Sequence, residues 1–159
     1  MLLKANRLFL FSYLILYSVF SACNDVDKNS EEELNTLIDN WHHSAAVADE
    51  DAFFGFMTDD CIYIGTDISE KWKRDELRKW SEKYFDRESA WSFNPYEREI
   101  YFNGNNAWFD EKLETWMGEC RGSGVLTKTD QGWKLKHYHL SVTIPNEKIQ
   151  DFINLNEEN

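Results

Sequence analysis

The chain has 159 residues, a length typical of a single domain. Its formal net charge of −12 disfavours a nucleic-acid-binding protein, because an acidic surface repels phosphates. No two of its three cysteines have the spacing of metal ligands, which argues against a structural zinc site, and we expect neither a metal nor a cofactor.

The first segment of the chain has the pattern of an export signal. Lys4 and Arg7 precede an apolar run over residues 8–20, which is too short for a comfortable membrane span. Small residues follow directly before Cys23, and this resembles the lipobox of bacterial lipoproteins. We therefore expect export, lipidation of Cys23 and anchoring in the bacterial cell envelope, with no other contact to the membrane. An ordinary secreted protein and an uncleaved N-terminal anchor are the alternatives.

Helices are predicted in the first half of the mature chain. Helical spacing of apolar residues predicts a first helix over residues 31–48, opened by the capping box of Ser30 and Glu33. A short, very apolar second helix is expected over residues 52–57. A strand at 61–64 follows. A third helix begins near residues 69–72, and its buried stripe consists of Leu77, Trp80, Tyr84 and Phe85.

The second half is predicted to be strands. They are expected at 91–93, interrupted by Asn94 and Pro95, and then at 96–102, 107–116, 120–129 and 133–142. Glycines at 104 and 132 mark two tight turns, because glycine tolerates positive φ. Cys61 and Cys120 are expected as two buried thiols rather than a disulfide. Helices followed by a run of strands indicate an α+β domain with helices on one face of a sheet.

The last strand carries the most informative pattern. Strict alternation places one set of side chains on a common face: Trp133, Leu135, His137, His139 and Ser141. Such a face is unusual for a plain core, and it fits a pocket that is apolar at its floor and polar at a few points.

Three segments carry a resemblance to a known family: residues 107–111 (AWFDE), 122–126 (GSGVL) and 132–141 (GWKLKHYHLS). In this order they resemble the SnoaL-like branch of the nuclear transport factor two-like superfamily. The resemblance implies a cystatin-like cone or half-barrel, in which a strongly curved, antiparallel-rich sheet wraps around N-terminal helices and encloses a pocket. It also implies a homodimer. The expected organisation is a lipoprotein signal peptide at 1–22, a polar tether at 23–30, a SnoaL-like domain at 31–145 and a C-terminal helix or tail at 146–159.

Candidate catalytic residues are a histidine and an acid. His139 is a candidate general base, because an imidazole titrates near physiological pH. Asp110 and Glu111 are adjacent in a strand, so one of them must face inward. The resemblance implies a similar pair, a pocket aspartate with a histidine, in cyclases of the family. The alternative is that the inward acid forms a structural ion pair with Arg121.

A ligand is expected to contact a larger set of side chains: Tyr63, Trp72, Trp108, Arg121, Trp133, His137 and Ser141. Trp41 belongs to the same aromatic group, whereas His42 and His43 are interpreted as helix-face residues. The first functional hypothesis is binding of a small molecule. The second is an isomerase, dehydratase or hydrolase that uses His139 with Asp110 or Glu111, and the third is a structural homodimerisation module. Because the fold family includes all of these, the resemblance does not choose among them.

Overall fold

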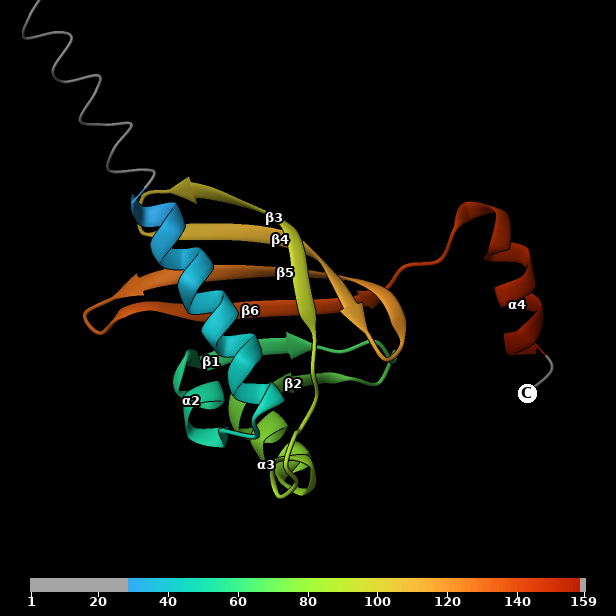
Figure 1. Ribbon diagram of the computed structural model, residues 1–159, viewed down its shortest axis with the longest axis horizontal. Helices are drawn as coiled ribbons and strands as arrows, with labels where there is room; N and C mark the ends of the chain where they lie inside the picture. Colours follow the sequence, from blue (N-terminus) through green and yellow to red (C-terminus); the bar gives the residue numbers. More distant parts are fainter. Residues whose placement is uncertain (1–28, 158–159) are drawn as a thin grey trace, which may run out of the picture. The chain divides into compact units, whose positions relative to one another are not determined.

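The structure is a computed structural model that describes residues 29–157 (Figure 1). The predicted signal peptide and Cys23 lie outside the described residues. The chain divides into two compact units, Met1–Ile38 and Asp39–Asn159. The described part of the first unit is helical over residues 29–38, and the second unit begins with helical residues 39–46. The first predicted helix is therefore present. It starts within the predicted tether. No helix among the described residues is both long and apolar enough to cross a membrane.

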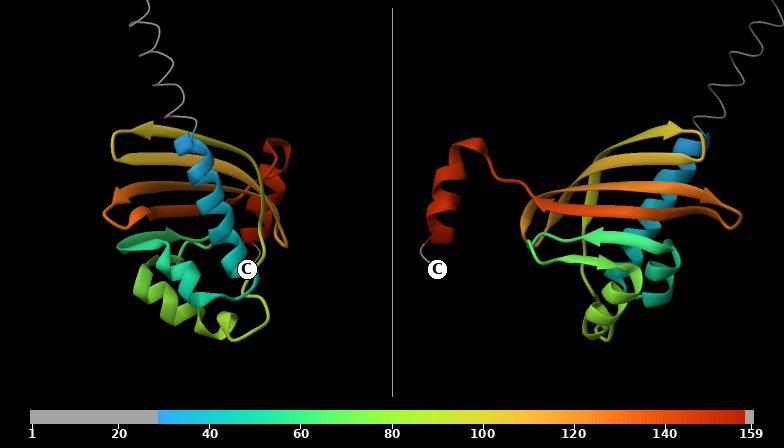
Figure 2. Two further views of the ribbon diagram at one scale, coloured as in Figure 1. Left: turned by 60° about the vertical axis from the view of Figure 1, so that its left-hand side comes forward. Right: turned by 180° about the vertical axis from the view of Figure 1, so that it is seen from behind.

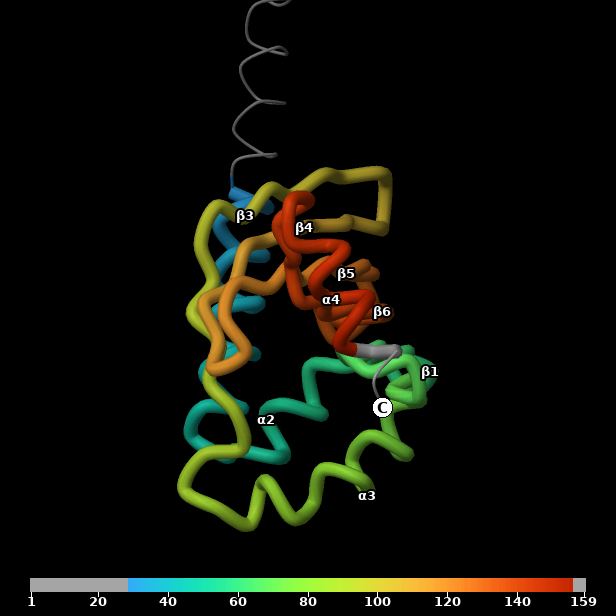
Figure 3. The backbone as a smooth tube through the Cα atoms, turned by 90° about the vertical axis from the view of Figure 1, so that its right-hand side faces the viewer, coloured from blue at the N-terminus to red at the C-terminus, as the bar shows by residue number. Residues whose placement is uncertain are grey.

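The second unit contains a six-stranded sheet and further helices. The helices are α2 (Glu50–Gly55), α3 (Arg74–Phe85), the short 3-10 helix η1 (Asn146–Lys148) and α4 (Ile149–Glu157). The strands are β1 (Met57–Ile64), β2 (Lys71–Lys73), β3 (Asn94–Asn103), β4 (Asn106–Thr115), β5 (Gly118–Thr129) and β6 (Gly132–Val142). α2 and α3 pack against β1, and α3 also packs against β2. Figure 3 shows both helices beside the β1 end of the sheet.

The strands are ordered β2-β1-β6-β5-β4-β3, and they lie side by side in one open sheet (Figure 2). All neighbouring pairs are antiparallel except β1 and β6, which are parallel. The predicted α+β, antiparallel-rich architecture is therefore confirmed. Both predicted tight turns are also present, with Gly104 at φ +58° and Gly132 at φ +95°.

Several boundaries differ from the sequence prediction. The predicted second helix already ends at Gly55, and β1 begins at Met57 instead of Cys61. Residues 71–73 form β2 rather than the start of the third helix, because Trp72 pairs with Tyr63 of β1. The helix begins only at Arg74, where the Glu76 carboxylate accepts the Lys73 backbone N–H at 3.0 Å and fixes the first turn.

β3 also differs, because it continues through the predicted interruption at Pro95. Proline is tolerated here since β3 is an edge strand, where one row of backbone N–H groups has no neighbour. The pairing of β3 with β4 is irregular between Tyr96 and Glu99, and Glu97 has a positive φ of 46°. Residues 91–93, predicted as a strand, have no strand structure.

β6 contains a one-residue bulge. Val125 lies opposite His137 and Leu126 lies opposite Leu135, so Lys136 is the additional residue. An extra residue in one strand reverses the face on which all later side chains lie.

The bulge overturns the predicted common face of β6. Leu135 is buried before the bulge, whereas Tyr138 and Leu140 are buried after it. His139 is exposed. The prediction that it shares the inner face with Leu135 is therefore wrong, because strict alternation does not hold across Lys136.

Cys61 and Cys120 are both buried free thiols, as predicted. Burial, followed by the negative charge of Asp60, raises the pKa of Cys61 to about 12. The thiol is therefore protonated at neutral pH and behaves as a small apolar side chain.

Candidate functional site

An aromatic pocket lies within the second unit, between β1, β2, α3, the segment that follows α3, the β4–β5 turn and β6. Its volume is about 230 Å³, and seven of its fourteen lining residues are aromatic. These seven are Tyr63, Trp72, Trp80, Tyr84, Trp91, Phe93 and Trp116. A concave, mainly apolar cavity with few polar groups is the usual form of a small-molecule site.

Five of these rings form a continuous wall. The ring centroids are 6.3 Å apart for Tyr63 and Trp72, and 4.6 Å apart for Trp72 and Trp80. The wall continues to Tyr84 at 5.1 Å from Trp80, and then to Trp91 at 6.5 Å from Tyr84. These separations lie in the range in which aromatic pairs attract one another, so the wall is held by its own contacts.

Polar side chains interrupt the apolar lining, namely Glu70, Thr66 and the tyrosines Tyr63 and Tyr84. Glu70 is the only charged residue among the fourteen described lining residues. Its Oε2 accepts the backbone N–H of Asp67 at 3.2 Å. A Cβ at Gly65 would lie only 2.2 Å from the same oxygen, so glycine is needed for Glu70 to lie this close to the chain.

Among the tyrosines of the lining, Tyr63 has a ring that is almost fully buried. Burial, reinforced by the negative charge of Glu70, raises the pKa of Tyr63 above its ordinary value, so its hydroxyl stays protonated. No hydrogen bond joins this hydroxyl to another group in the described part of the chain. It is therefore a donor that a ligand can use.

A buried charge network lies next to the pocket. The fully buried Glu111 accepts a hydrogen bond from His42 Nε2 at 2.7 Å and one from Arg98 Nε at 2.8 Å. Arg98 also pairs with Asp39 at 2.7 Å, and the Tyr138 hydroxyl donates to Glu111 at 3.2 Å. Burial alone would raise the pKa of Glu111, but the hydrogen bond and charge of His42 and the charge of Arg98 hold it below its ordinary value. The carboxylate is therefore ionised and satisfied.

Gly122 leaves the space that this network needs. It lies opposite Glu111 in the pairing of β4 with β5. A Cβ at this position would approach the Tyr138 hydroxyl to 2.2 Å and Glu111 Oε1 to 2.9 Å. Gly122, the first glycine of the GSGVL segment, thus allows the Tyr138 hydroxyl and the Glu111 carboxylate to come within hydrogen-bond distance of each other.

The network and the pocket share a boundary. The rings of Tyr138 and Tyr63 are 5.4 Å apart, so Tyr138 lies between the pocket wall and Glu111. A second hollow, of about 430 Å³, is lined by His42, and Phe93 lines both this hollow and the aromatic pocket. The His42 imidazole is therefore near the pocket but does not line it.

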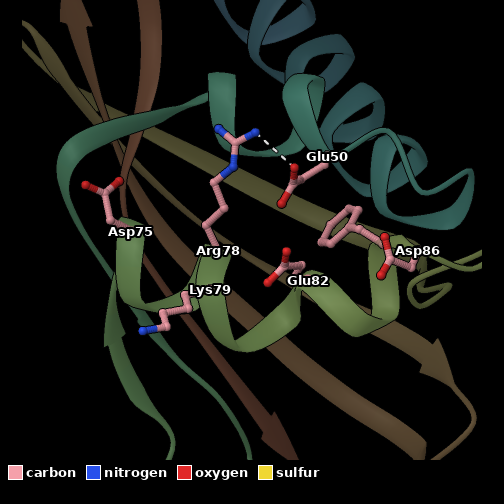
Figure 4. Close-up of a pocket in the computed structure, with 7 residues that line it drawn as sticks. Glu50, Asp75, Arg78, Lys79, Glu82 and Asp86 are labelled. Atoms are coloured by element: carbon pink, nitrogen blue, oxygen red, sulfur yellow. Dashed lines mark hydrogen bonds and ion pairs between the residues drawn. The ribbon is translucent and has the colours of Figure 1, made fainter.

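A third hollow, of about 470 Å³, lies between α2 and α3 and is lined mainly by charged side chains (Figure 4). Arg78 pairs there with Glu50 at 2.9 Å and with Asp51 at 2.7 Å. The three side chains of these pairs are all in contact with solvent, so this hollow is best described as a hydrated surface.

The structure places two of the predicted ligand residues, Tyr63 and Trp72, in the aromatic pocket. Trp133 is buried but lines none of the three hollows. The other predicted ligand residues do not reach the pocket: Trp108, Arg121, His137 and Ser141. Trp108 is 45% exposed because Ala107 and Phe109 take the inner positions of β4.

The predicted catalytic residues are not brought together in the pocket. Glu111 is the inward acid that the strand pattern required, and Asp110 lies on the outer face. Ser123 of β5 lies between Asp110 of β4 and His139 of β6. The predicted ion pair of the inward acid with Arg121 is wrong. Arg121 is exposed and aligned with an outward position of β4.

Arg98, the cation that pairs with Glu111, was not predicted from the sequence. Sequence reasoning also missed His42, although its neighbour Trp41 was placed on the buried stripe of the first helix. Partners 69 residues apart, as His42 and Glu111 are, leave no local pattern in a single sequence. No group of three or more His, Cys, Asp or Glu side chains within residues 29–157 has an arrangement that could hold a metal ion.

Comparisons with known proteins agree on the fold. An NTF2-like protein of unknown function from Pseudomonas putida matches with a TM-score of 0.64 at 14% identity, over 76% of this chain and 92% of that one. A candidate scytalone dehydratase from Novosphingobium aromaticivorans matches with a TM-score of 0.63 at 12% identity, over 76% and 89%. A cystatin-like protein of unknown function from Nostoc punctiforme gives 0.59 at 16% identity, over 71% and 90%. At these identities the likeness shows the fold alone.

No curated protein sequence matches the chain significantly. The model of the SnoaL-like domain family, however, matches residues 34–145, which is most of the chain. These are the residues that carry the open mixed sheet, the aromatic pocket and the buried charge network. The chain therefore belongs to the SnoaL-like domain family.

Proposed function

We propose that the protein binds a small, largely apolar molecule in the aromatic pocket. The observation that carries this proposal is the lining itself, which contains seven aromatic side chains and a single carboxylate. Aromatic walls give a ligand a large contact area, and the polar groups on Glu70 and Tyr63 give it an orientation. A structural module would instead fill the cavity with its own side chains.

The binding proposal is tested with 2-phenylpropan-2-ol, a neutral aromatic alcohol that fits a cavity of this size. Trp72→Ala removes a central part of the wall, and we expect it to weaken binding about tenfold or more in isothermal titration calorimetry, because about 1.4 kcal/mol of contact energy is lost. Trp116→Ala, which removes an exposed lining residue, is a second variant that leaves the core intact.

The matched control is Trp108→Ala, which removes a tryptophan from the outer face of the sheet. It should bind the alcohol as the unchanged protein does. If Trp72→Ala and Trp116→Ala bind the alcohol as tightly as Trp108→Ala does, the pocket is not the ligand site.

Acid–base catalysis is the second candidate function, and one observation favours it. His42 is held by Glu111 at 2.7 Å and lines the hollow next to the pocket, and a carboxylate that orients an imidazole in this way suits a general base. His42 and Glu111 take the place of the predicted catalytic pair, which was His139 together with Asp110 or Glu111. Because Glu111 is already shared by Arg98 and Tyr138, we rank this function below binding. Turnover of a bound compound that is lost in His42→Gln, with binding retained, would reverse that order.

We propose that the protein is exported and anchored through Cys23. The support is the sequence pattern of two early cations, an apolar run and small residues before Cys23. We expect the full chain expressed in a bacterium to sediment with membranes, and Cys23→Ser to move it into the soluble envelope fraction. A variant that still sediments with membranes would instead indicate an uncleaved anchor.

We also propose that the protein is a homodimer that associates through the outer face of the sheet. Tyr101 and Trp108 support this, because their stacked rings, with centroids 5.7 Å apart, are 42% and 45% exposed. Sedimentation equilibrium should give twice the mass of the chain, and Trp108→Glu should give the mass of one chain.

A further inference from the structure

We propose that the ligand of the aromatic pocket is an organic cation, namely a tertiary or quaternary ammonium that carries apolar groups. This inference rests on the proposed binding function and adds the chemical class of the ligand. Three properties of the described residues support it: the faces of the rings, a Glu70 carboxylate that forms no ion pair, and the lack of basic side chains in the lining.

The aromatic wall offers the surface that an ammonium group prefers. The face of an aromatic ring carries partial negative charge and attracts a cation within about 6 Å of its centroid, with tryptophan the strongest. Four of the seven aromatic lining residues are tryptophans. Methyl groups on a quaternary nitrogen also bury apolar area against these rings, so a substituted ammonium gains from both effects.

Rings of this wall already attract cations of the chain itself. Lys83 Nζ lies 4.9 Å from the centroid of Tyr84 and 5.9 Å from that of Trp80. Arg87 Cζ lies 4.8 Å from the centroid of Tyr84. Neither Lys83 nor Arg87 is among the residues that line the pocket, so the cavity itself is left to a ligand cation.

Glu70 supplies the counter-charge. It is half-buried at the pocket, and it forms no ion pair with a basic side chain within the part of the chain that the structure describes. Its backbone contact with Asp67 and the close approach allowed by Gly65 fix its position without neutralising it. A carboxylate next to apolar rings is stabilised by a cation more than one in bulk water is, because the local dielectric constant is lower.

The rest of the charge pattern agrees. No Lys, Arg or His is among the fourteen described residues that line the pocket, so an anionic ligand would meet only repulsion from Glu70. The formal net charge of −12 raises the local concentration of cations and speeds their approach. A neutral ligand would use the same rings and can donate a hydrogen bond to Glu70, but it would lack the attraction between opposite charges.

The experiment compares two probes of nearly equal shape, phenyltrimethylammonium and 2-phenylpropan-2-ol, by isothermal titration calorimetry at low ionic strength. We expect the cation to bind at least about tenfold more tightly than the alcohol. Raising the salt concentration should weaken binding of the cation alone, because exposed and partly exposed charges are screened.

Glu70→Gln tests the role of the carboxylate, because glutamine has the same size and can still accept the Asp67 N–H. We expect this variant to bind the cation about tenfold more weakly and the alcohol within about twofold of the unchanged protein. Glu99→Gln, at an exposed carboxylate on the edge strand, makes the same change in net charge and should alter neither affinity.

The outcomes separate this inference from the binding proposal. If the alcohol binds as tightly as the cation, or if Glu70→Gln leaves the preference unchanged, the pocket remains a binding site but its ligand is not a cation. If neither probe binds, both proposals fail. The salt dependence of the unchanged protein keeps the inference testable even if Glu70→Gln folds poorly.

Discussion

Replacing Glu111 by glutamine is expected to lower the free energy of unfolding by about 3–5 kcal/mol. Glu111 is 0% exposed, and its two oxygens hold His42 at 2.7 Å and Arg98 at 2.8 Å. Without the carboxylate, the guanidinium of Arg98 stays almost buried and loses its main counter-charge. Such a loss is a large fraction of the total stability of a domain of this size. Urea denaturation followed by tryptophan fluorescence would measure it.

The same carboxylate predicts a pH dependence. Because the folded pKa of Glu111 lies below its ordinary value of 4.5, its contribution to stability is present above about that pH. The contribution is lost as the pH falls through the folded pKa. The unchanged protein should therefore lose stability in acid more steeply than Glu111→Gln. Glu99→Gln is the control, since it changes an exposed carboxylate and should alter stability by less than about 0.5 kcal/mol. A Glu111→Gln variant within about 1 kcal/mol of the unchanged protein would contradict the account.

Replacing Phe53 by alanine is expected to cost about 3–5 kcal/mol, because it leaves a cavity in a close-packed cluster of rings. Phe53 is 1% exposed, and its ring centroid lies 5.1 Å from Trp41, 5.0 Å from Phe54 and 5.3 Å from Trp91. Since Trp91 lines the aromatic pocket, the cavity should also loosen one side of the binding site. Chemical denaturation measures the stability, and calorimetry with 2-phenylpropan-2-ol measures the affinity.

The control for this prediction is Phe152→Ala in α4. Phe152 is 46% exposed, so its removal should change the free energy of unfolding by less than about 0.5 kcal/mol. Equal losses in the two variants would mean that the ring cluster around Phe53 is not the core of the second unit.

The fold class was predictable because local signals agreed with one another. Alternating apolar residues indicated the long strands, and Gly104 and Gly132 marked the β3–β4 and β5–β6 turns. The start of the third helix was not predictable in the same way. Trp72 was expected near the start of this helix, and only its pairing with Tyr63 of β1 makes it part of a strand.

The candidate site was less predictable, because one extra residue decides which side chains face inward. The alternation from Trp133 to Ser141 looks intact in the sequence, although Lys136 forms a bulge between them. The apolar pair Tyr138 and Leu140, on the face predicted to be outer, was the available signal that the faces exchange. Glu70 was missed because it lies in a loop, where periodicity carries no information.

The central claim, that the aromatic pocket binds a small molecule, is tested most directly by fluorine NMR of the protein labelled with 5-fluorotryptophan at all seven tryptophans. Four of them line the pocket, namely Trp72, Trp80, Trp91 and Trp116, and three do not, namely Trp41, Trp108 and Trp133. On titration with 2-phenylpropan-2-ol, the account predicts saturable shifts of the four pocket resonances and little change in the other three. Saturable shifts confined to the three outside the pocket, or no shift at all, would contradict it.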